Sequence, residues 1–243
     1  DSKAQRIAHY NRAKWEDKRT EPTTYFGERF FMDHIITNSP LSDSVKGHKA
    51  AVPFLDDYTG FSDLIAVKKK TSEETIRATK EYLGTWREEE LDHAYTCQSD
   101  SSLEIKEAMA TLNLAHNTST PGVPQSNGRA ERNGRTILEG TRAIMAQAGI
   151  PHRMWPWAAR HFCLMRNVVP RKGVSINQTP WMLRHGEPFK GRLIPFGARI
   201  RFLMPEIPQS SKPSEITGKE KARTEHTPKM GEKALCGVFL GYH

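Results

Sequence analysis

The sequence predicts a mixed α/β fold, and two features of its hydrophobic pattern support this. Short apolar runs of strand length fill the first third of the chain, and amphipathic segments of helical period follow them. A sheet covered by helices buries both kinds of apolar face. Of the 243 residues, 37% are hydrophobic, so the chain can bury a sizeable core. No run approaches the ~18 apolar residues of a membrane span, so no membrane association is expected.

The first third of the chain is expected to form three strands in a meander. Apolar runs cover residues 29–36, 51–55 and 62–68, and the turn residues 56–60 separate the second run from the third. Pro53 lies inside the second run. It favours an edge strand or a bulge, because proline has no N–H to donate to a neighbouring strand.

A capping box predicts where the first helix begins. Thr71 precedes Glu74 by three residues, so these two side chains can satisfy free N–H groups of the first turn. The remaining elements follow from periodicity and turn signals. In order, they are helix 72–89, strand 91–99, helix 103–112, strand 114–119, loop 121–127, helix 128–149, helix 154–167, helical turn 179–184, and strands 198–204 and 235–240.

Charge is unevenly distributed along the chain, which has a net charge of +8. Residues 73–107 contain four basic and ten acidic side chains, whereas residues 129–201 contain fourteen basic and three acidic ones. An arginine-rich half suits a phosphate-binding surface, although a merely solvated surface explains it equally well. The three cysteines are far apart and form no CxxC pair, which favours a reducing, intracellular compartment over a disulfide framework.

Three carboxylates differ from the many solvated ones. Asp33 lies within an apolar run, where an isolated charge is costly, and Asp100 lies at the end of a later strand. Glu131 lies in the first turn of a helix, seven residues before Leu138. At 100° per residue this spacing places Glu131 about 20° from Leu138, so it is expected to point inward with the apolar stripe.

Inward-facing acids from three separate elements suggest a shared cation. Oxygen ligands alone favour Mg²⁺ or Mn²⁺, and two such ions can stabilise both oxygens of a phosphoryl transfer. The alternative is structural: Asp33 pairs with an arginine, and Asp100 caps the helix that follows it.

The surroundings of these acids resemble a known family. The chain closely resembles the catalytic core of copia-type retrotransposon integrases over about residues 12–243. The matching stretches, in family order, are GERFFMDHI, FLDDYTGF, CQSDSS, VPQSNGRAERNGRT, MAQAGIPHRMWPWAARHFCLMRNVVP, TPWMLRHGEPFKGRLIPFG and CGVFLGYH.

This resemblance implies a fold and a chemistry. The fold would be RNase H-like, a mixed central sheet flanked by helices, with a small and incomplete C-terminal β module. Asp33, Asp100 and Glu131 would form the DDE triad of a polynucleotidyl transferase cut from a Pol polyprotein. Asp33 would bridge two Mg²⁺ (or Mn²⁺) ions, and Asp100 and Glu131 would each hold one. The activity would be 3′-end processing and strand transfer, which join retroelement DNA to target DNA.

The resemblance also implies a DNA interface. Gln125 and Asn127 would face DNA from a flexible active-site loop, and Arg129, Arg132 and Arg135 would contact phosphates along one side of the helix. The lysines at 68–70 would add only non-specific attraction, and Asp56 and Asp57 would be structural turn residues. Element ends and target would be double-stranded DNA in the nucleus, and the working unit would be a homo-oligomer.

Three segments are expected from the same comparison. Residues 1–24 would be a tail following a missing N-terminal zinc-binding region, and residues 25–190 the catalytic core. Residues 191–243 would form the β module, with a flexible loop at 205–233 that is polar and rich in proline and lysine. Trp155 and Trp157 are expected to pack inside the core.

The chain departs from the family pattern at three places. It has Ser99-Asp100-Ser101-Ser102 where the family has SDNG, only thirty residues between Asp100 and Glu131, and Gly134 where asparagine is usual. A catalytically degenerate core that retains only nucleic-acid binding or self-association therefore stays as an alternative. A nuclease of the RNase H type that cleaves RNA–DNA hybrids is a third hypothesis.

Overall fold

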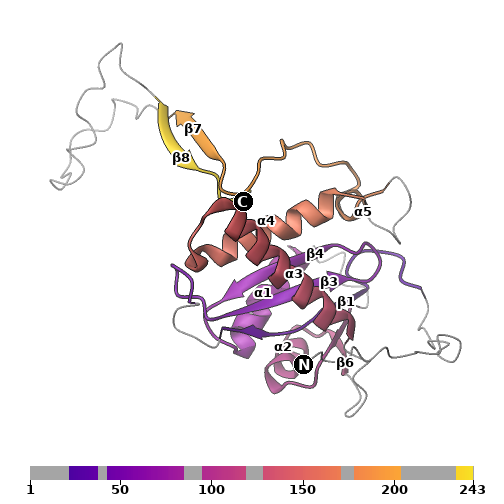
Figure 1. The fold of residues 1–243 in the computed structure, drawn as a ribbon. Coiled ribbons are helices and arrows are strands. Elements are labelled where there is room, and N and C mark those ends of the chain that lie inside the picture. Colours follow the sequence, from indigo (N-terminus) through magenta and orange to yellow (C-terminus); the bar gives the residue numbers. More distant parts are fainter. Residues whose placement is uncertain are drawn as a thin grey trace, which may run out of the picture.

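The computed structural model of the chain describes residues 22–37, 43–84, 95–118, 128–170, 178–203 and 234–242. These residues form a six-stranded sheet with helices on both faces and a separate two-stranded ribbon (Figure 1). Residues 1–21 of the expected tail, the loops at 121–127 and 205–233, and residues 85–89 of the helix expected at 72–89 lie outside the described residues. The mixed sheet flanked by helices confirms the predicted fold class.

The large sheet contains both parallel and antiparallel pairs. Its strands are β1 (Arg29–Met32), β2 (Ile35–Ile36), β3 (Ala50–Asp56), β4 (Ser62–Val67), β5 (Thr96–Ser99) and β6 (Ala115–Thr118). Strand β3 runs antiparallel to β4 on one side and to β1 and β2 on the other. Strands β5 and β6 continue the sheet beyond β1 in parallel. The ends of β1, β4 and β5 therefore meet at one edge of the sheet.

The position of Pro53 contradicts the expectation from sequence. Strand β3 is a central strand rather than an edge strand, and Pro53 pairs with Leu64 of β4. On its other side the neighbouring strand is interrupted, because β1 ends at Met32 and β2 begins at Ile35. A proline is tolerated in the middle of the sheet because the break lies where its missing N–H would be needed.

Helices cover both faces of the sheet (Figure 1). They are α1 (Ser72–Leu83), α2 (Leu103–Thr111), α3 (Gly128–Ala148), a 3-10 turn (His152–Met154), α4 (Trp155–Val168) and α5 (Pro180–His185). The Oγ1 of Thr71 accepts a hydrogen bond from the N–H of Glu74, which confirms the predicted cap. Helix α1 ends earlier than expected, because Gly84 adopts a φ of 91° and its N–H donates to the Lys80 carbonyl.

Separate hydrophobic clusters fill the two sides of the sheet. Helices α1 and α2 pack against one face through a core that includes Phe30, Met32, Phe54, Tyr82 and Met109. Helices α3 and α4 pack against the other through Ala51, Leu64, Ile137, Ala159 and Cys163. Trp155 packs against the second of these clusters, and Trp157 packs against a third one formed by Met145, Ala158 and Phe196, so both tryptophans pack in the protein interior as predicted.

The C-terminal strands form a ribbon that projects from the rest of the molecule (Figure 1). Strands β7 (Arg199–Leu203) and β8 (Ala234–Val238) pair antiparallel. The chain after β8 returns to the core, where the rings of Phe239 and Tyr242 contact the ring of His161 on α4. Within the described residues, no helix is both long enough and apolar enough to traverse a lipid bilayer.

Candidate active site

Asp33 lies in the break between β1 and β2 and is half-buried. Its Oδ1 accepts a hydrogen bond of 2.7 Å from the N–H of His34. Burial raises the pKa of the Asp33 carboxyl, and the negative charges of Asp100 and Glu131 raise it further. The ammonium of Lys70 and the His34 N–H act in the opposite direction. Asp33 is thus a half-buried carboxylate on which the negative charges of two other acids act.

Asp100 directly follows β5, as the sequence predicts, and is half-buried. Strands β1 and β5 are parallel neighbours in which Phe31 pairs with Gln98. The same register extended by two residues places Asp100 level with Asp33. The Oδ1 of Asp100 also accepts a hydrogen bond of 3.2 Å from the N–H of Ser102, the N-cap of α2. The structural alternative therefore holds in part, since Asp100 helps to begin α2 while its charge also raises the pKa of Asp33.

Glu131 lies in the first turn of α3, but its predicted inward orientation is wrong. The side chain is exposed and lies beside the buried face of the helix. That face comprises Ala130, Asn133, Gly134, Ile137, Thr141 and Met145. Small residues bring the helix close to the sheet, so the inward face has no room for a glutamate. Its charge nevertheless raises the pKa of Asp33, so it lies within electrostatic range of that carboxyl.

The structure therefore brings the three acids close enough for their charges to interact, but not close enough to bind one metal ion together. In the part of the chain that the structure describes, no group of three or more His, Cys, Asp or Glu side chains is gathered closely enough to hold a metal ion. The donor chemistry fits a hard divalent cation, because all three groups are carboxylates. The mutual repulsion that raises the pKa of Asp33 is the kind of strain that a bound cation relieves.

Two neighbours of the acids were not expected to take part in the site. His34 is half-buried, with its Nε2 3.0 Å from the Thr75 hydroxyl, and burial lowers its pKa to about 4. Lys70 forms an ion pair of 3.6 Å with Glu104, and its charge acts on both Asp33 and His34. Pattern within the sequence does not single out Lys70; it comes near Asp33 because β4, which it follows, runs in the same direction as β1 in the sheet.

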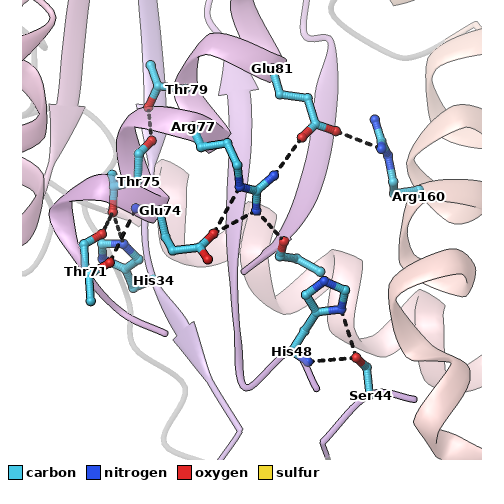
Figure 2. Close-up of polar contacts among 11 residues, drawn as sticks. His34, Ser44, His48, Thr71, Glu74, Thr75, Arg77, Thr79, Glu81 and Arg160 are labelled. Atoms are coloured by element: carbon cyan, nitrogen blue, oxygen red, sulfur yellow. Dashed lines mark hydrogen bonds and ion pairs between the residues drawn. The ribbon is translucent and has the colours of Figure 1, made fainter. Parts of the chain in front are cut away.

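Polar contacts fix α1 against the sheet (Figure 2). Arg77 bonds Glu74 and Glu81 on its own helix and donates to the Ala66 carbonyl on the edge strand β4. Glu81 in turn accepts a hydrogen bond from Arg160 on α4. The edge strand is thus covered by paired charges from both helical layers, which discourages pairing with another chain.

The predicted DNA-binding residues differ in position and exposure. Gln125 and Asn127 lie outside the described residues. Arg132 and Arg135 are exposed on α3. Arg129 is also largely exposed, but its guanidinium pairs with Asp57 and lies 4.5 Å from the centre of the Phe31 ring. This arginine is therefore anchored to the sheet.

The turn after β3 confirms the structural role expected of Asp56. Its fully buried carboxylate accepts hydrogen bonds from the N–H of Gly27 at 2.9 Å and from the N–H and hydroxyl of Thr59 at 2.8 and 2.6 Å. Asp57 bonds Arg29 through Nε at 2.7 Å. Neither acid belongs to the group around Asp33.

The sheet order and its two helical layers define an RNase H-like fold, the fold of integrase catalytic cores. A simian T-cell lymphotropic virus intasome, solved in complex with PP2A regulatory subunit B56 gamma, matches with a TM-score of 0.51 and 15% identity, over 76% of this chain and 66% of that one. The HTLV-2 integrase catalytic core domain in complex with magnesium (trimeric form) matches with a TM-score of 0.47 and 18% identity, over 66% of this chain and 98% of that one. No family model matches the chain.

Sequence relatives point in the same direction. The retrovirus-related Pol polyprotein from transposon TNT 1-94 of Nicotiana tabacum is 24% identical over 82% of this chain. That from transposon RE1 of Arabidopsis thaliana is 27% identical over 85%. The chain spans only 14% and 13% of these polyproteins. Its curated relatives are thus Pol polyproteins of plant copia-like transposons, which confirms the resemblance predicted from the motifs.

Proposed function

We propose that the chain is the catalytic core of a retroelement integrase, which cuts element DNA near its 3′ ends and joins it to target DNA. The observation that supports this most is the register of β1 against β5, which brings Asp100 level with Asp33, while the charge of Glu131 on α3 also acts on the Asp33 carboxyl. Acids that repel one another at the edge of a sheet lower the stability of the fold. A functional site is the usual reason for keeping such a group.

Asp33, Asp100 and Glu131 would hold two Mg²⁺ or Mn²⁺ ions. When bound, such ions neutralise charge on the reacting phosphate and lower the pKa of a bound water. The chain's own groups orient the acids: the His34 N–H fixes one oxygen of Asp33, and the Ser102 N–H fixes one oxygen of Asp100. The Lys70 ammonium partly offsets the negative charge before a cation arrives.

Double-stranded DNA would lie along the exposed side of α3, where Arg132 and Arg135 can bind phosphates. Gln125 and Asn127 would contribute from the loop that precedes α3, and Arg129 would add positive charge from its anchored position. A homo-oligomer acting in the nucleus, where chromosomal DNA is the target, completes the proposal.

A cleavage and joining assay tests this function. The protein is incubated with a duplex oligonucleotide that mimics an element end, with Mn²⁺ or Mg²⁺, and nicked and joined products are separated on a gel. We expect products from the unmodified chain and a loss of at least about 100-fold in Asp100→Asn or Glu131→Gln. Glu139→Gln is the matched control, because Glu139 is an exposed acid on the same helix.

The degenerate core remains a second candidate, and one observation favours it. The three acids do not form a closed ligand set among the described residues, and Glu131 is exposed. This candidate predicts salt-sensitive DNA binding that divalent cations do not change, with no cleavage. Cleavage of an RNA–DNA hybrid without cleavage of duplex DNA would instead support the nuclease hypothesis.

A further inference from the structure

Asp57 joins the sheet to the helix that carries Glu131. Its side chain is only 8% exposed and lies between two arginines. Arg29, on β1, donates to Oδ2 through Nε at 2.7 Å, with a second guanidinium nitrogen at 2.5 Å. Arg129, on α3, donates to Oδ1. One carboxylate thus connects the start of β1, the turn after β3 and the first turn of α3.

Arg129 is held at a second point as well. Its guanidinium lies over the ring of Phe31 at 4.5 Å from the ring centre. Phe31 is buried on β1, two residues before Asp33. The arginine therefore fixes the beginning of α3 above the strand that leads into the acid group.

The first turn of α3 needs such an anchor. The first four N–H groups of any helix have no partner within it, so this turn is the part that most easily unwinds. The next hydrogen bond toward the C-terminus joins the side chain of Asn133 to the Phe54 carbonyl at 3.0 Å. Glu131 lies between these two attachments, at 129 and 133.

We propose that Asp57 is a positioning residue: through Arg129 it fixes the first turn of α3 on β1 and thereby holds the Glu131 carboxylate near Asp33. Its effect on catalysis rests on the proposed function, whereas its effect on the helix does not. The proposal also separates Arg129 from its neighbours on α3, because Arg129 would act by its bond to Asp57 rather than by binding DNA directly.

Hydrogen–deuterium exchange of the metal-free protein tests the positioning directly. We expect Asp57→Asn and Arg129→Gln each to speed exchange of the amides of residues 132–134 by about tenfold. The double variant should be no faster than the faster single variant, because both changes break the same bond. Arg142→Gln is the matched control, since Arg142 is exposed on the same helix about three turns further on. Exchange that is unchanged in either single variant, or additive in the double variant, overturns the proposal.

Two further measurements keep the outcomes distinct. Calorimetry with Mn²⁺ alone should show about fivefold weaker binding in both single variants and no change in Arg142→Gln. If the unmodified chain neither binds Mn²⁺ nor cleaves DNA, the proposed function fails while the exchange data still decide the positioning. Arg129→Gln leaves the Arg29–Asp57 pair intact. Its exchange rates therefore still test the positioning if Asp57→Asn does not fold. Weaker DNA binding by Arg129→Gln with unchanged exchange would make Arg129 a DNA contact and overturn the proposal.

Discussion

Pro53 on β3 lies opposite Asp33, at a position where the antiparallel pairing would place a backbone hydrogen bond between the two strands. The N–H of Asp57 donates to the Arg29 carbonyl and the N–H of Thr37 to the Lys49 carbonyl, which fixes a single register for β3 against β1 and β2. In that register every second pair is hydrogen-bonded, and Pro53 with Asp33 is one of them. Because proline has no N–H, the hydrogen bonding of β3 to β1 and β2 is interrupted at Asp33.

Replacing Pro53 by alanine should repair this ladder. The new N–H can donate to the Asp33 carbonyl, so we expect β1 and β2 to join and the amide of residue 53 to exchange slowly in NMR. Straightening the break should also turn the Asp33 carboxylate away from its neighbours and weaken Mn²⁺ binding by about tenfold. An amide at 53 that exchanges as fast as those in exposed turns would contradict the assigned register.

Two glycines of α3 should respond in opposite directions to alanine. At Gly134 a Cβ would meet Ile35 and Pro53 at 3.5 and 3.6 Å, which is ordinary contact. Gly134→Ala should therefore raise the free energy of unfolding by about 1 kcal/mol, the usual helix preference for alanine. At Gly140 a Cβ would meet the Phe162 ring at 2.1 Å, so Gly140→Ala should lower it by ~1–3 kcal/mol. Urea unfolding of both variants measures these changes. If both substitutions raised the free energy of unfolding, or both lowered it, α3 would pack differently from the structure.

Glu131→Gln should lower the pKa of Asp33. One of the like charges that raise this pKa disappears in the variant, although burial still keeps it above the ordinary aspartate value. Carboxyl-carbon NMR of Asp33 across a pH titration measures the change, with Glu139→Gln as the control. An Asp33 pKa that is the same in both variants would mean that Glu131 does not lie near the acid group.

His34 should make the protein less stable in mild acid. Its pKa is about 4 in the fold, below the ordinary value of 6.5, because burial disfavours the charged ring. The unfolded chain therefore binds a proton that the native state resists, so the free energy of unfolding falls as the pH drops from about 6.5 toward 4.

His34→Gln should flatten this part of the stability curve, since glutamine keeps a polar partner for Thr75 without titrating. Urea unfolding at a series of pH values provides the measurement, and His152→Gln, at an exposed histidine, is the control. If the variant keeps the full acid-side slope of the unmodified chain, other buried histidines are responsible.

The positions of most elements could be predicted from local pattern. The cap at Thr71 gave the start of α1, and the period of apolar residues gave α3 and α4 to within one residue. The structural role of Asp56 in its turn is confirmed as well, although the family resemblance rather than local pattern predicts it. The end of α1 was missed because Gly84 terminates a helix whose apolar pattern continues.

The candidate site could be predicted only in outline. The three acids were found, but the outward orientation of Glu131 was not, because 100° per residue gives an angle and does not say which stripe of the helix faces the sheet. The anchoring of Arg129 was missed for another reason. Asp57 and Arg129 are 72 residues apart, and nothing in the residues around either one indicates that the two side chains pair.

The order of strands and helices, the capped start of α1 and the three separated acids were determined by the sequence alone, because capping, turns and hydrophobic period act within a few neighbouring residues. The break at Asp33 opposite Pro53, the bond from Asp57 to Arg129 and the approach of Lys70 to Asp33 were decided only by the tertiary structure. Each depends on the register of paired strands or on the contact of distant segments, and these are set when the whole core packs.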